Sequence, residues 1–65
     1  MARVAEVRHT SGEGWYFVVR GGPFGDEVSD FYGWRASAVR GAKTLDVGLV
    51  RVYSRSGRLV KTIGG

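Results

Sequence analysis

Basic side chains crowd the last part of the chain, and they are the residues best suited to contact a charged partner. Arg51, Arg55, Arg58 and Lys61 lie close together, with Tyr53 among them. Arginine and lysine neutralise phosphates, and an exposed tyrosine can stack on a base. These residues predict contact with DNA or RNA at low sequence specificity. A solvated hairpin, with Tyr53 packed in the core or in a dimer interface, is the alternative.

The charges are distributed unevenly along the chain, whose net charge is +4. Residues 1–33 hold three arginines and five carboxylates, whereas residues 34–65 hold seven basic residues and one carboxylate. This asymmetry favours a basic face for a polyanion. Mutual neutralisation of the two halves across the fold is the alternative. Three further cations, Arg35, Arg40 and Lys43, extend the predicted contact if their segment and the hairpin share a side.

Enzymatic chemistry is disfavoured, and we expect no catalytic residue, cofactor or metal. The chain has one histidine and no cysteine, so no triad can be assembled around either residue. We expect His9 to be a solvated residue in a polar loop. An acidic segment with Asp26, Glu27 and Asp30 lacks the distinct, partly buried environments of an acid–base pair.

A second hypothesis starts from the aromatic strand Trp15–Arg20. Alternation places Trp15 and Tyr16 on opposite faces, and a single thin domain is not expected to bury both. We therefore expect a homodimer. The alternative function is a protein-interaction or inhibitory module, phage or mobile-element encoded, that acts on a host protein. Its contact surface would be aromatic and acidic: Trp15, Tyr16, Asp26, Glu27 and Asp30.

The elements that must position these residues form one domain spanning residues 1–65. Valine-rich and aromatic runs predict strands over 3–8, 15–20 and 24–31, the last an acidic edge. A hairpin over 48–54 and 58–63 follows a helix. The fold class is thus α+β, a small antiparallel sheet with one packed helix, in the order β-β-β-α-β-β.

The predicted helix covers residues 36–45. Trp34, Ala38, Ala42 and Leu45 form its apolar stripe on a helical wheel. Gly41 costs the helix roughly 0.5–1 kcal/mol relative to alanine, so we expect it to allow close approach to the sheet.

Two turns are compatible with the hairpin. Gly57 suits the left-handed position of a turn followed by a bulge, and a two-residue turn over Ser56 and Gly57 is the alternative. The two turns give different pairing registers for the last strand.

No apolar run reaches the length of a membrane span or a signal-peptide core. We therefore expect no membrane contact and a cytoplasmic location.

Short motifs from Gly14 onward link the chain to a known group of proteins. They are Gly14-Trp15, Gly33-Trp34 and the run A-S-A-V-R-G at 36–41. With them the chain resembles small YegP-type proteins of unknown function from bacteria, archaea and phages. Two departures are a slightly shorter spacing before the helix and a more acidic return strand. The resemblance implies a ββα unit with dimer-like packing, and it brings no known activity.

Overall fold

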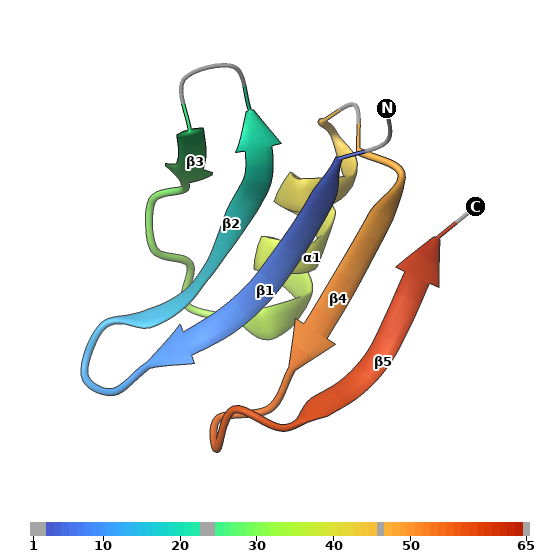
Figure 1. Cartoon of the computed structure of the whole chain (residues 1–65). Coiled ribbons are helices and arrows are strands. Elements are labelled where there is room, and N and C mark those ends of the chain that lie inside the picture. The colour runs from blue at the N-terminus through green and yellow to red at the C-terminus, as the bar shows by residue number, and fades with distance from the viewer. Residues whose placement is uncertain (1–2, 23–24, 46, 65) are drawn as a thin grey trace.

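The computed structural model describes residues 3–22, 25–45 and 47–64 of the chain. Five strands and one helix follow one another in the predicted order, which confirms the α+β class (Figure 1). The elements are β1 (Val4–Thr10), β2 (Gly14–Gly22), β3 (Gly25–Val28), α1 (Arg35–Lys43), β4 (Leu49–Tyr53) and β5 (Leu59–Gly64).

The strands form one sheet in the order β3-β2-β1-β4-β5, with β1 at its centre. The pairs β1–β2, β2–β3 and β4–β5 are antiparallel, as expected. The pair β1–β4 is parallel, so the sheet is mixed rather than antiparallel throughout. The helix is the reason, because the chain passes through α1 behind the sheet and returns beside β1 in the same direction (Figure 1).

The apolar core lies between α1 and the face of the sheet that the helix covers. Trp15, Phe17 and Val19 of β2 belong to it, and each is at most 8% exposed. The other buried members are Ala5, Val7, Ala38, Ala42, Val50 and Val52. The predicted division of β2 into two faces is therefore confirmed. We call the sheet face away from α1 the open face.

The helix is shorter than predicted and buries only the middle of its expected stripe. Ala38 and Ala42 are fully buried, but Trp34 is 76% exposed and Leu45 is 38% exposed. Trp34 is the N-cap, with extended backbone angles of −129° and 143°, and Leu45 lies beyond the C-cap Thr44. Helical periodicity therefore applies to neither end.

No helix among the described residues is long and apolar enough to cross a membrane.

Gly41 is a point of close approach between the helix and the residues beneath it. A Cβ atom at this position would lie 2.6 Å from the Tyr32 hydroxyl oxygen and 3.1 Å from Cε2 of Phe17. A side chain therefore cannot be added without moving an aromatic ring. This contact confirms the role expected for Gly41.

The β4–β5 hairpin resolves the choice between the two turns. The Gly57 amide donates to the Ser54 carbonyl at 3.0 Å, and the Ser54 amide donates to the Arg58 carbonyl at 2.8 Å. Gly57 has a φ of 89°, so it occupies the left-handed position of the turn that is followed by a bulge. A register shift follows, between the pairs Val52–Lys61 and Tyr53–Leu59.

The bounds of every strand differ from the prediction by at least one residue, and two of these differences concern residues discussed above. β1 continues to Thr10, so His9 lies in a strand opposite Trp15 and not in a loop. The centroids of the His9 and Trp15 rings are 4.9 Å apart, and His9 is half-buried rather than solvated. β3 is an edge strand as predicted, but it ends at Val28. Its expected first residue, Phe24, lies outside the described residues.

Candidate nucleic-acid interface

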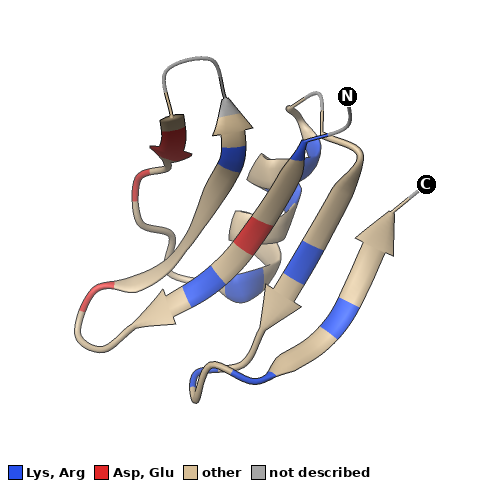
Figure 2. Cartoon of the chain, in the orientation of Figure 1, with Lys and Arg blue, Asp and Glu red and all other residues tan. Residues whose placement is uncertain are grey.

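Opposite charges gather at the two edges of the sheet (Figure 2). The β3 edge and the loop after it carry three exposed carboxylates, Asp26, Glu27 and Asp30. The β5 edge and its hairpin carry three exposed cations, Arg55, Arg58 and Lys61. The acidic and basic residues are therefore separated in space as well as along the sequence.

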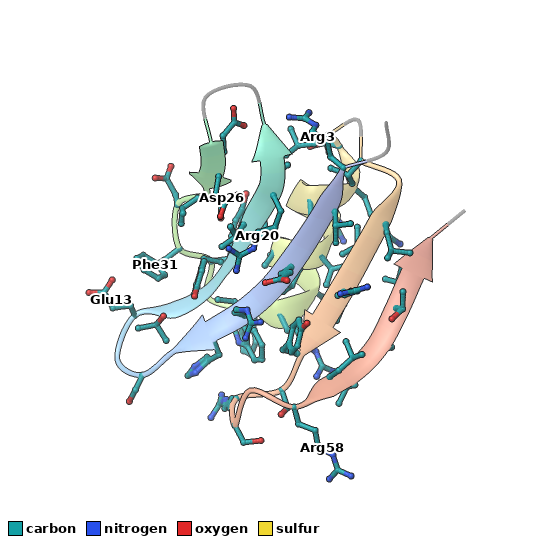
Figure 3. All side chains as sticks on the ribbon, viewed as in Figure 1. Arg3, Glu13, Arg20, Asp26, Phe31 and Arg58 are labelled. Carbon is teal, nitrogen blue, oxygen red and sulfur yellow. The ribbon has the colours of Figure 1, made fainter. Side chains whose placement is uncertain are left out.

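The acidic half forms its ion pairs with its own arginines. Glu6 Oε1 lies 3.1 Å from Arg8 Nε and 3.1 Å from Arg20 Nη2. Arg20 Nη1 lies 2.7 Å from Asp26 Oδ2, and Figure 3 labels these two residues. These are the ion pairs found within 3–22, 25–45 and 47–64, and every one joins residues of the first half. Within the described residues, no ion pair joins the acidic half to the basic half.

The Glu6 carboxylate makes the stability of the fold depend on pH. Partial burial raises its pKa, but hydrogen bonds from Arg20 and Arg8, with their charges, outweigh this and hold the pKa below the ordinary value of 4.5. A depressed pKa stabilises the fold above the unfolded-state pKa, and this contribution is lost as pH falls through the folded-state pKa.

Replacement of Glu6 by glutamine is expected to lower the free energy of unfolding at neutral pH by up to about 1 kcal/mol. The difference from the parent should vanish in strongly acidic buffer, because the parent carboxyl is then protonated. Urea unfolding of both proteins across this pH range measures the effect. A difference that stays constant with pH would contradict the assignment.

The basic residues of the hairpin are divided between the two faces of the sheet. Val52 is fully buried under the helix, so its neighbours Arg51 and Tyr53 lie on the open face. Lys61 pairs with Val52 and therefore lies on the helix side. The structure does not bring these three residues onto one surface.

One face of the Tyr53 ring is in contact with an arginine. The Arg8 guanidinium carbon lies 4.0 Å from the centre of the Tyr53 ring, in a cation–π contact. Tyr53 is half-buried, on the open face and not in the core. One side of the ring is therefore occupied, which disfavours the stacking role predicted for it.

Arg55 and Arg58 project from the tip of the hairpin, and Figure 3 shows Arg58 extending away from the sheet. The Arg58 amide donates to the Ser54 hydroxyl at 3.2 Å, and this hydroxyl lies 2.9 Å from that of Ser56. The turn is thus held by local hydrogen bonds while both cations remain exposed.

A groove opens between α1 and β5, because the helix packs on β1, β2 and β4 but does not contact β5. It has a cavity volume of about 500 Å³. We call it the basic groove, and its lining residues are Trp34, Arg35, Ala36, Val39, Arg40, Lys43 and Lys61.

The basic groove joins two sets of cations that the sequence could not place together. The helix supplies Arg35, Arg40 and Lys43, and the sheet supplies Lys61. The lining contains no carboxylate, and within the described part of the chain none of these cations forms an ion pair. The groove is therefore suited to an anion.

Trp34 is the groove residue that sequence reasoning missed as a contact. The helical wheel assigned it to the core, whereas its side chain is largely exposed at the groove. Its position directly after Gly33 and before the helix was the available signal, since a residue at the N-cap does not follow the helical wheel.

The residues predicted for a protein interface have different environments. Trp15 is 6% exposed beneath α1, so it presents no surface to a partner. Tyr16 lies on the open face, where its ring meets Phe31 edge to face at 5.7 Å. The helix thus buries Trp15, whereas Tyr16 stays half-buried on the open face, and the expected homodimer stays a prediction.

The acidic part of that predicted interface remains at the surface. Asp26 is paired with Arg20, while Glu27 and Asp30 are exposed. No group of three potential metal ligands occurs among the residues that the structure describes.

Comparisons with known proteins leave the resemblance to YegP-type proteins as a prediction. No protein-family model matches the chain, and no curated protein or solved structure was found to match it.

Proposed function

We propose that this protein binds nucleic acid, DNA or RNA, with low sequence specificity, through the basic groove. The observation that carries the proposal is the gathering of four cations and an exposed tryptophan around one groove without a carboxylate. Cations of this kind neutralise phosphates and release counterions, which is the main source of non-specific affinity. Arg55 and Arg58 add two exposed cations in the hairpin turn that leads into β5.

Low sequence specificity follows from the side chains available. Asparagine and glutamine, which read adenine with paired hydrogen bonds, do not occur in the sequence. Between Arg35 and Arg40, α1 contributes Ala36 and Val39 to the lining of the groove. Contacts to the backbone and to the faces of bases therefore fit this surface better than reading of base edges.

The proposal is non-enzymatic and places the protein in the cytoplasm. A homodimer stays a prediction. Two copies would set two basic grooves on one nucleic acid and raise the overall affinity through a high effective concentration.

Binding to labelled nucleic acid across a salt series tests the proposal. We expect the logarithm of the association constant to fall linearly with the logarithm of salt concentration, by about 0.7 to 0.9 per phosphate contact. Heparin serves as a polyanion without bases. Absence of binding at low salt, with the fold intact by circular dichroism, would exclude nucleic-acid binding through this groove.

A second candidate function rests on the opposite edge of the sheet. Val28 is 65% exposed and Phe31 is 48% exposed, beside the carboxylates of β3 and its following loop. An apolar patch with acidic neighbours fits a basic segment of a host protein. Binding of such a partner, together with failure of the salt series, would favour this candidate.

A further inference from the structure

We infer that the ligand of the basic groove is single-stranded nucleic acid, with an unpaired base stacked on Trp34. This inference rests on the proposed function and names the form of nucleic acid that the groove accepts. It is carried by the exposed indole, by the cations beside it and by the concave shape of the site.

The Trp34 side chain is unusually exposed for its type. It is 76% exposed, whereas the other tryptophan, Trp15, is 6% exposed in the core. Within the described residues, Trp34 takes part in no aromatic pair and no cation–π contact. An indole left open beside cations offers a flat surface for a base, and stacking of this kind tolerates any sequence.

The cations continue from Trp34 along the groove. At 1.5 Å of rise per residue, Arg40 lies about 9 Å and Lys43 about 13 Å along the helix from Trp34. Lys61 faces the groove from β5. A strand whose base rests on Trp34 can therefore place its following phosphates between the helix and β5.

The shape of the groove favours a single strand over a duplex. Its volume of about 500 Å³ is within the range of pockets that enclose small ligands, whereas a duplex presents a broad convex surface. In a duplex the base faces are already stacked, and opening one step costs a few kcal/mol. The Trp34 indole can stack fully only on a base that is already unpaired.

The test compares an oligothymidylate of about eight nucleotides with a duplex of equal phosphate number, at low salt. We expect the single strand to bind more tightly and to quench Trp34 fluorescence, while buried Trp15 supplies a constant background. Trp34→Ala should weaken single-strand binding by about fivefold to one hundredfold, and duplex and heparin binding much less, because neither offers an unpaired base. Trp34→Phe should restore most of the affinity, because it keeps a stacking ring.

The outcomes separate this inference from the function on which it rests. Salt-dependent binding of both nucleic acids that is equal and insensitive to Trp34→Ala would overturn the inference and leave the proposed function standing. Thymidine monophosphate that binds as tightly as the oligonucleotide would also overturn it, in favour of a free nucleotide. No salt-dependent binding of either nucleic acid would remove both.

Discussion

Gly14→Ala is expected to unfold most of the protein, with a loss of about 3 kcal/mol or more in the free energy of unfolding. Gly14 has a φ of 110°, a region that residues with a side chain rarely adopt. A Cβ atom there would lie 2.5 Å from the backbone oxygen of Tyr32. That oxygen cannot move freely, because it accepts the Trp15 amide at 2.8 Å while the Tyr32 amide donates to Trp15 at 2.6 Å.

This contact ties the segment before the helix to β2. The Tyr32 ring also stacks on Phe17 at 6.1 Å and approaches Gly41 of α1, so displacement of Tyr32 disturbs the packing of the helix. A domain of this size has only a few kcal/mol of stability, so the loss should approach the total.

Gly12→Ala is the matched control. Gly12 also has a positive φ, of 84°, but an added Cβ would meet no atom within 4 Å. We expect it to cost only the backbone strain, about 1–2 kcal/mol. Urea unfolding followed by circular dichroism measures both variants. Equal losses at the two positions would show that the contact with Tyr32 contributes nothing.

Lys61→Glu is expected to cause a large loss of nucleic-acid affinity. The change removes one cation and places a carboxylate among Arg35, Arg40 and Lys43, which line the same groove. If two phosphates of a single strand are no longer neutralised, the salt slope falls by about 1.4 and binding at low salt weakens roughly tenfold to one hundredfold. Titration of labelled single strand across a salt series measures both quantities.

Arg51→Glu is the control for net charge. It changes the charge by the same amount on the neighbouring strand, but Arg51 lies on the open face, away from the groove. We expect only a small decrease in affinity from the altered long-range field. Equal weakening by the two substitutions would mean that overall charge, and not the basic groove, determines binding.

Local patterns predicted the elements of this fold well. Alternation along β2 placed Trp15 and Tyr16 on opposite faces, and Gly57 marked the hairpin turn without deciding between the two possible turns. The helix ends were less well predicted, because Trp34 and Leu45 lie outside the helical backbone to which the wheel applies. The parallel pairing of β1 with β4 depends on the path through α1, and no residue of either strand encodes that path locally.

For the candidate site, too, the sequence determined some features and the tertiary structure determined the others. The sequence alone determined which residues are basic, that most of them belong to the second half of the chain, and that the helix carries small residues where it approaches the sheet. Only the tertiary structure decided which cations share a surface. Because Lys61 pairs with the buried Val52, it lies on the face of the sheet that α1 covers, in one groove with Arg40 and Lys43. Arg51 and Tyr53 flank Val52 along β4 and therefore lie on the open face. The reason is physical: side chains alternate across a sheet at every residue, so the face on which each one lies depends on strand pairing and on where the helix ends.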